Sequence, residues 1–160
     1  LDESSNQGAI ISKMHFDKIM HCIDIAKKEG GTILCGGHSL TIPGRCEKGY
    51  FIEPTIIENL GPDCKTNREE IFGPVLTVQS FRTEDEVIEK ANNTPFGLSA
   101  GVWTDKGSKI FNMTTKLKAG VVWANTYNKF DPTSPFGGYK ESGYGREGGL
   151  HGLAPYLNLV

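Results

Sequence analysis

The second half of the chain alternates short runs of apolar and β-branched residues with longer segments of helical periodicity. The short runs at 75–81, 98–103 and 121–125 predict strands, because β-branched and aromatic residues favour an extended backbone. Between them, apolar residues recur every three to four positions, which predicts helices that end near Asn92 and Gly120. This β-α-β-α-β order predicts an α/β fold with a layered, open sheet.

Several residues indicate where helices begin or end. A helix is predicted from Met14 onward, and the glycine pair that starts at Gly30 ends it. Thr83 and Glu86 match a capping box, in which each side chain bonds the backbone near the other residue. Asp105 is expected to cap the helix that follows it. The expected buried face of the first helix contains Phe16, Ile19, Met20, Ile23 and Ala26.

Composition excludes several classes of function. The 160 residues suit one domain, and 17 basic against 19 acidic side chains give a net charge of −2. This balance gives no electrostatic reason to expect nucleic acid or an anionic membrane as a partner. No apolar run approaches the roughly 20 residues of a membrane span, and the polar N-terminal residues do not resemble a signal peptide.

The four cysteines lie far apart in the sequence, with no C-x-x-C spacing. They are interpreted as reduced thiols of a cytoplasmic protein rather than as disulfides or zinc ligands. Cys22 is expected in the middle of a helix, and Cys35 at the end of a buried strand. Neither setting lowers a thiol pKa, so the residues alone identify no nucleophile.

The segment 69–74, Glu-Glu-Ile-Phe-Gly-Pro, is the first candidate site. Its Gly-Pro end forces the chain to turn or extend immediately before a predicted strand. A carboxylate and a phenyl ring at that place could hold a flat, polar ligand. The alternative is an ordinary turn with Phe72 in the core, which the residues alone favour because such phenylalanines are commonly buried.

A second candidate region follows the predicted strand at 121–125. Residues 126–149 lack a regular pattern and are rich in glycine and aromatic residues, and long irregular segments are often functional. The aromatic residues form either the wall of an apolar pocket at the carboxyl end of a strand or part of the core. They are Trp123, Tyr127, Phe130 and Phe136.

Several motifs in the same order resemble the aldehyde dehydrogenase superfamily, and the resemblance covers nearly the whole chain. They are Gly-Tyr-Phe-Ile-Glu-Pro-Thr at 49–55, the segment 69–74, Ala-Asn-Asn at 91–93 with Phe-Gly-Leu at 96–98, Ala-Gly-Val-Val-Trp-Ala-Asn at 119–125, and Pro-Phe-Gly-Gly-Tyr-Lys-Glu-Ser-Gly at 135–143. The resemblance implies that residues 1–148 are the C-terminal part of the catalytic domain. Residues 149–160 would begin a C-terminal oligomerisation segment.

The family oxidises an aldehyde to a carboxylic acid with NAD or NADP. A cysteine thiolate attacks the carbonyl, hydride passes to the nicotinamide, and a glutamate activates the water that cleaves the thioester. The resemblance implies that all these groups lie upstream of this chain, which alone is expected to be inactive, marginally stable and prone to associate. The expected partners are an aldehyde and further copies of the chain, as a dimer or tetramer.

Five residues are matched to family positions that contact a ligand. The resemblance implies that Glu70 bonds the hydroxyls of the nicotinamide ribose and that Phe72 lies beside the nicotinamide. It implies that Phe136 and Phe130 line the substrate tunnel and that Asn128 lies at the mouth of this tunnel.

Three more residues match a branch of the family that oxidises betaine aldehyde. The backbone carbonyls of Lys140 and Gly143 would bind potassium between subunits, and Glu147 would be a charge-relay carboxylate. Two alternatives remain open. The chain could be a truncated, non-catalytic module for binding or assembly, or part of an acylating or phosphate-reducing relative with the same thiol chemistry.

Overall fold

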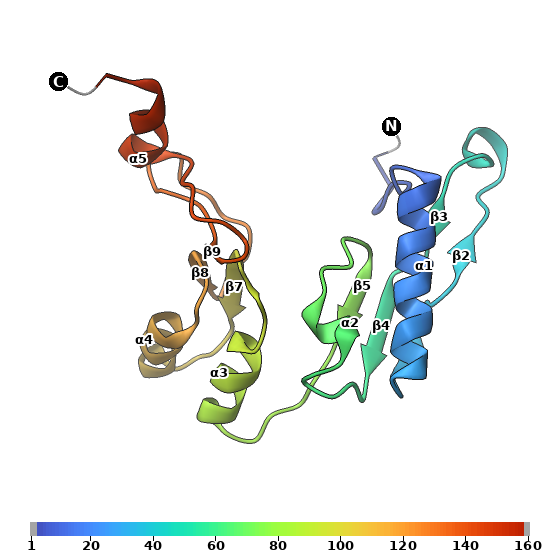
Figure 1. Ribbon diagram of the computed structural model, residues 1–160, viewed down its shortest axis with the longest axis horizontal. Helices are drawn as coiled ribbons and strands as arrows, with labels where there is room; N and C mark the ends of the chain where they lie inside the picture. Colours follow the sequence, from blue (N-terminus) through green and yellow to red (C-terminus); the bar gives the residue numbers. More distant parts are fainter. Residues whose placement is uncertain (1–2, 159–160) are drawn as a thin grey trace. The chain divides into compact units, whose positions relative to one another are not determined.

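The computed structural model describes residues 3–158 and divides into two compact units, residues 1–80 and residues 81–160 (Figure 1). Each unit has its own helices, strands and apolar core. The units are therefore described separately.

The first unit packs one long helix against a three-stranded sheet. The strand order is β1-β4-β5, with β1 antiparallel and β5 parallel to the central β4, while β2 and β3 form an antiparallel pair. Its elements are α1 (Lys13–Lys28), β1 (Thr32–Cys35), β2 (Ser39–Leu40), the 3₁₀ turn η1 (Gly44–Cys46), β3 (Phe51–Ile52), β4 (Thr55–Glu58), α2 (Lys65–Arg68) and β5 (Val75–Thr77).

Helix α1 forms where the sequence predicts it and runs alongside β4 (Figure 1). Ile19, Ile23 and Ala26 are fully buried, and their spacing of four and three residues places them on one face. At the start of the helix, the hydroxyl of Ser12 accepts a hydrogen bond from the backbone N–H of the third helical residue. At its end, Gly30 takes the left-handed conformation (φ 91°) that commonly ends helices.

The second unit contains two pairs of short strands, one parallel and one antiparallel, with helices beside them. Strands β7 and β8 are parallel, and β6 and β9 are antiparallel. Val102, Met113 and Leu117 form the core. The elements are α3 (Glu84–Asn92), β6 (Phe96–Gly97), β7 (Ser99–Val102), α4 (Gly107–Lys116), β8 (Val121–Ala124), β9 (Tyr139–Lys140), α5 (Gly149–Leu153) and the 3₁₀ turn η2 (Ala154–Tyr156).

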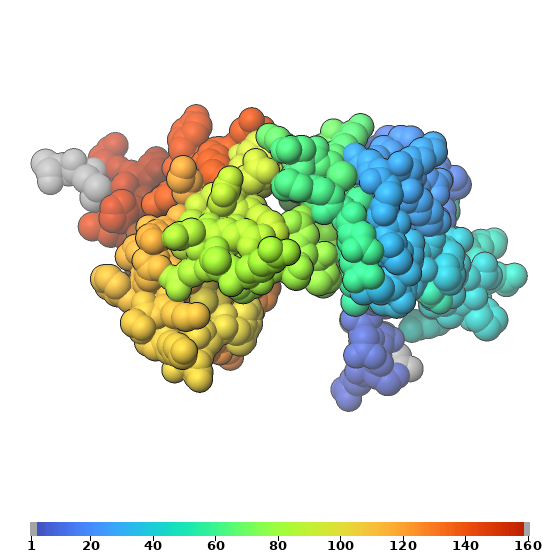
Figure 2. Space-filling model, turned by 90° about the horizontal axis from the view of Figure 1, so that it is seen from below, coloured from blue at the N-terminus to red at the C-terminus, as the bar shows by residue number. Residues whose placement is uncertain are grey.

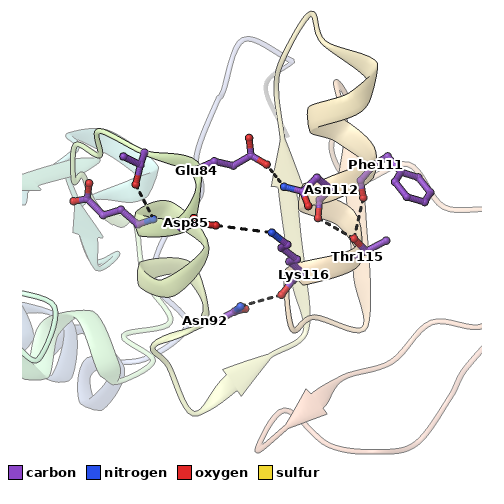
Figure 3. Close-up of polar contacts among 9 residues, drawn as sticks. Glu84, Asp85, Asn92, Phe111, Asn112, Thr115 and Lys116 are labelled. Carbon is purple, nitrogen blue, oxygen red and sulfur yellow. Dashed lines mark hydrogen bonds and ion pairs between the residues drawn. The ribbon is translucent and has the colours of Figure 1, made fainter.

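Polar contacts connect α3 to α4 (Figure 3). The amide of Asn112 donates to the Glu84 carboxylate, and the ammonium group of Lys116 lies 3.8 Å from the Asp85 carboxylate. The Asn92 side-chain amide donates to the Lys116 carbonyl at 3.0 Å. These bonds lie outside the apolar core, so they fix how the two helices pair rather than replace apolar packing.

Two local predictions are wrong. Helix α4 begins at Gly107 and is preceded by Lys106 without a side-chain cap, so Asp105 does not cap it. Cys35 is exposed, because β1 is an edge strand with mostly exposed residues.

The capping box is confirmed: the Thr83 hydroxyl accepts from the Glu86 N–H, and the Glu86 carboxylate accepts from the Arg82 N–H. Among the described residues no helix has the length and apolarity needed to cross a membrane.

The Glu29 carboxylate holds the short helix α2 in place. It accepts hydrogen bonds from the Lys65 N–H at 2.7 Å, from the Thr66 N–H at 3.2 Å and from the Thr66 hydroxyl at 2.6 Å. The Thr66 hydroxyl bond is the main cause that lowers the pKa of Glu29 below its usual value. Since α2 ends immediately before the segment 69–74, Glu29 helps to place the first candidate site.

We expect the stabilising effect of Glu29 to disappear in acid. A carboxyl whose pKa is lower in the folded state stabilises fully above its unfolded pKa of about 4.3 and loses this effect as pH falls through the lower folded value. Urea unfolding between pH 7 and pH 3 should show Glu29→Gln less stable than the native chain at neutral pH, with the difference shrinking below about pH 4.3. Glu47→Gln, at an exposed carboxyl of the same unit, should differ little throughout; a pH-independent Glu29 difference would contradict the assignment.

Candidate functional site

The segment 69–74 follows α2 and leads into β5. Ile71 points inward and packs against the core cluster of Ile19, Ile23 and Ile52. The side chains on either side of it, Glu70 and Phe72, are exposed. One partly buried residue, Ile71, thus anchors a segment whose neighbouring carboxylate and ring are both exposed and available to a ligand.

Phe72 is not a core residue, so the interpretation of the segment as an ordinary turn with a buried ring is wrong. Its side chain is 74% exposed, and its backbone is left-handed with φ 59°. That conformation costs a bulky residue roughly 1–2 kcal/mol. Residues with a strained backbone cluster at active sites and ligand-binding sites, so Phe72 is a candidate for contact with a ligand.

Two side chains of α1 bond backbone carbonyls of the segment 69–74. His15 Nε2 lies 2.7 Å from the carbonyl oxygen of Phe72, and Lys18 Nζ lies 3.0 Å from the carbonyl oxygen of Glu70. A carbonyl oxygen only accepts, so His15 must carry a proton on Nε2. The imidazole also meets the Phe72 ring edge-on, with 6.2 Å between the ring centres.

Position 73 has no room for a side chain, so a glycine is needed there. A Cβ atom there would lie 2.7 Å from Cδ1 and 2.8 Å from Cγ1 of the buried Ile19. Figure 2 shows the green atoms of the region around α2 and β5 lying directly against the light-blue atoms of α1. The absence of a side chain at Gly73 therefore lets the segment 69–74 approach the helix closely.

These contacts are of the size needed to offset the strain at Phe72. A hydrogen bond contributes about 0.5–1.5 kcal/mol net, comparable with the cost of the left-handed conformation. Neither His15 nor Lys18 was identified as a site residue from the sequence. Their spacing of three on one helix face was visible, but the carbonyls that they bond lie more than 50 positions further along the chain.

The second candidate region lies in the second unit and forms a chain of aromatic rings. Trp123 contacts Tyr127 and Phe130 edge-on, with ring centres 4.9 Å and 5.4 Å apart, and Phe130 contacts Phe136 at 5.0 Å. Trp123 is buried, whereas Tyr127 and Phe130 are more than half exposed. The cluster therefore has one side in the core and one open side that could contact an apolar ligand.

Backbone geometry fixes the turn beside these rings. Asn128 is left-handed (φ 58°) and exposed, and the next carbonyl, that of Lys129, accepts a hydrogen bond from Trp123 Nε1 at 2.8 Å. The two backbone hydrogen bonds between Phe136 and Glu147, both 2.7 Å, close the loop. The side chain of Asn128 is thus presented to solvent beside the aromatic cluster.

The remaining predicted residues have structural contacts of their own. The Lys140 ammonium group bonds the carbonyls of Asn92 and Thr94 at 2.9 Å and 3.0 Å, and the Lys140 carbonyl accepts from the Gly143 N–H at 3.3 Å. The Glu147 side chain is exposed. Potassium binding by the Lys140 and Gly143 carbonyls, and a charge relay through Glu147, remain predictions.

All four cysteines are free thiols. Desolvation by burial is the main cause that raises the pKa of the Cys22 thiol above its usual value. No group of three or more histidine, cysteine or acidic residues within residues 3–158 could hold a metal ion. Outside both candidate regions, the Nε2 of His38 lies 3.0 Å from the Glu53 carboxylate.

The chain is therefore an α/β protein with two sets of exposed aromatic and polar side chains, one on the segment 69–74 after α2 and one on the loop that follows β8. The chain belongs to the aldehyde dehydrogenase family, whose model matches residues 1–160. The predicted family and the α/β fold class are therefore confirmed.

Relatives and solved structures agree with this assignment. Betaine aldehyde dehydrogenase of Brucella anthropi is 46% identical over 159 residues, which is 99% of this chain and 32% of that enzyme. Human retinal dehydrogenase 2 is 46% identical over 158 residues, 99% of this chain and 30% of the enzyme. A crystal structure of betaine aldehyde dehydrogenase from Staphylococcus aureus aligns with a TM-score of 0.91 and 41% identity, covering 98% of this chain and 31% of that one.

A structure of the indole-3-acetaldehyde dehydrogenase AldA from P. syringae in complex with NAD⁺ also aligns, with a TM-score of 0.91 and 38% identity over 97% of this chain and 31% of that one. The chain thus spans about a third of the length of the relatives and structures that it matches.

The close contact between Gly73 and Ile19 makes a testable prediction. We expect Gly73→Ala to destabilise the chain by about 1–3 kcal/mol, because the added methyl group overpacks a filled site. Adding Ile19→Ala should give a double variant that loses less than the sum of the two single losses, since the removed atoms are those that the methyl group meets. Urea unfolding measures the free energy of unfolding of the two single variants and of the double variant.

The matched control is Gly107→Ala, where nothing lies within 4 Å of the added Cβ atom. It should be neutral or slightly stabilising, because alanine is the better helix former. Equal effects of the two glycine substitutions would show that the contact with Ile19 does not matter.

Proposed function

We propose that this chain is the C-terminal part of the catalytic domain of an NAD(P)-dependent aldehyde dehydrogenase. Residues 1–148 would belong to that domain, and residues 149–160 would begin a segment used for oligomer assembly. Family membership supports the proposal, as does the NAD⁺ present in an aligned relative. The free thiols favour a reducing compartment such as the cytoplasm.

The observation that carries the proposal is the exposed Phe72 ring, which a strained backbone holds two residues after the exposed Glu70 carboxylate. These two residues fit a nicotinamide riboside. A carboxylate accepts hydrogen bonds from two neighbouring hydroxyls, as a ribose offers them. A phenyl ring offers an apolar face or edge to a flat heterocycle. The bound nicotinamide would accept the hydride, while Glu70 and Phe72 bind and orient the nicotinamide riboside.

Phe130, Phe136 and Asn128 would contact the aldehyde. The two rings meet edge-on and present an apolar wall that stays partly exposed, and Asn128 adds an amide at the edge of this wall. Relatives are named for betaine aldehyde, retinal and indole-3-acetaldehyde. An aromatic wall suits an aldehyde with apolar surface. The thiol nucleophile would come from residues outside this chain.

The test uses the complete polypeptide that carries this chain. It should form NADH or NADPH in the presence of an aldehyde. Phe72→Ala and Glu70→Gln should each raise the Kd for the cofactor by about five- to thirtyfold, because each removes one contact worth roughly 1–2 kcal/mol. Isothermal titration calorimetry measures the affinity.

Two controls match these variants. Phe111→Ala removes a ring that is 73% exposed on α4, and Glu47→Gln removes an exposed carboxylate of the first unit. Both should leave cofactor affinity unchanged. A native polypeptide that neither binds the cofactor nor oxidises any aldehyde would favour a truncated binding or assembly module. Cofactor reduction that requires coenzyme A or phosphate would favour an acylating or phosphate-reducing relative.

The end of the second unit supports the proposed assembly role. Leu150, Leu153 and Tyr156 are 66%, 54% and 85% exposed, and with residues on α5 and the preceding loop they line a cavity of about 590 Å³. Apolar side chains gathered in this way mark surfaces that another protein covers. We propose that a second copy of the protein covers them.

We therefore expect the double variant Leu153→Ser and Tyr156→Ser to shift the complete polypeptide towards monomers. Sedimentation velocity at several concentrations measures the change. Phe111→Ser removes an equally exposed apolar side chain from α4 and should leave the distribution unchanged. An unaltered distribution in the double variant would mean that this surface is not part of the subunit contact.

A further inference from the structure

We propose that Trp123 is a positioning residue for the aldehyde, because its indole holds the loop that carries Asn128 and Phe130. This inference rests on the proposed contact of Phe130, Phe136 and Asn128 with the aldehyde. It gives a role to a residue that is itself buried, since Trp123 is 8% exposed and lies in β8.

The loop after β8 folds back on the strand that it leaves. Asn125 and Asn128 are both left-handed, with φ 53° and 58°, a conformation that asparagine adopts more readily than most residues. The reversal brings the carbonyl oxygen of Lys129 to the indole of Trp123, whose Nε1 donates to it at 2.8 Å. One hydrogen bond thus closes the loop of residues 123–129.

The start of this loop is fixed without the indole. The Asn125 side chain bonds both backbone groups of Thr104: its oxygen accepts from the N–H at 2.9 Å, and its amide donates to the carbonyl at 3.0 Å. Strand β8 is paired with β7, where Gly101 stands opposite Trp123. What the indole N–H adds is therefore the position of the residues that follow Asn125.

The same indole restrains the ring of Phe130. That ring lies between two others and meets both almost perpendicularly, at 87° to Trp123 and at 86° to Phe136, a favourable arrangement of aromatic pairs. Phe136 is held in turn by its two backbone hydrogen bonds with Glu147. Because Phe130 is 55% exposed, loss of the bond to the preceding carbonyl would leave its ring free to take several positions.

The first measurement detects the hydrogen bond without any aldehyde. In the 160-residue chain, labelling with carbonyl-¹³C lysine and ¹⁵N-phenylalanine selects the single Lys-Phe pair, Lys129-Phe130. Trp123→Phe keeps an aromatic ring but removes the N–H, so the Lys129 carbonyl resonance should shift. Trp103→Phe changes the other tryptophan, which is 63% exposed, and should leave this resonance in place.

The second measurement compares the KM of the complete polypeptide for two aldehydes, hexanal and acetaldehyde. We expect Trp123→Phe to raise the KM for hexanal about three- to tenfold, the effect of a lost hydrogen bond. The KM for acetaldehyde, which offers only one methyl group to the rings, should change less than twofold. If another aldehyde is the better substrate, both are measured as competitors against it.

Two further variants complete the series. Trp123→Leu also removes the ring contact with Phe130 and should raise the KM for hexanal further than Trp123→Phe does. Trp103→Phe should leave both KM values unchanged. A merely structural role of Trp123 would instead reduce the amount of active enzyme, which lowers the apparent kcat for both aldehydes equally and leaves both KM values as they were.

The outcomes separate this inference from the function on which it rests. If Phe130→Ala raises the KM for hexanal but Trp123→Phe does not, the positioning role is wrong and the proposed aldehyde contact stands. If neither Phe130→Ala nor Phe136→Ala changes this KM, the proposed function of the two rings fails. An unshifted Lys129 carbonyl resonance in Trp123→Phe, or an equal rise of KM for both aldehydes, would overturn the inference.

Discussion

The burial of one face of α1 is the interaction on which the first unit depends. Ile19, Ile23 and Ala26 are fully buried against residues of β3, β4 and the turn that follows β4. Each such side chain contributes about 1.5–3 kcal/mol when removed from water, or somewhat less for alanine. The exposed part of the same helix can then present polar groups at fixed positions, because the buried face allows little rotation.

The segment 69–74 uses this rigidity. Its one inward side chain, Ile71, joins the core of α1, and its glycine fits against Ile19. The backbone between these two anchors has little freedom, and it is there that Phe72 takes its left-handed conformation. Strain and exposure coincide at Phe72 because packing fixes the residues on both sides of it.

Regular elements could be predicted from the sequence wherever the signal is local. The periodicity of α1 and the capping box at Thr83 each depend on residues within one or two helical turns, and both are confirmed. Cys35 was wrongly expected to be buried, because sequence cannot show that β1 lies at the edge of its sheet. The bond between His15 and Phe72 could not be predicted either, since it joins residues 57 positions apart. The family motifs indicated Phe72 as a site residue, but only the structure shows its strained backbone and its partner.

Asn92 connects three segments of the second unit through its hydrogen bonds, and these bonds restrict which side chain can stand at position 92. Its side-chain amide donates to the Lys116 carbonyl, its side-chain oxygen accepts from the Lys118 N–H, and its backbone carbonyl accepts from the Lys140 ammonium group. Aspartate would present an oxygen where a donor is needed, and leucine would satisfy neither backbone group. Glutamine carries the same amide on a stem one methylene longer. Asparagine supplies both a donor and an acceptor on a short stem, and through them three segments of the chain meet at this position.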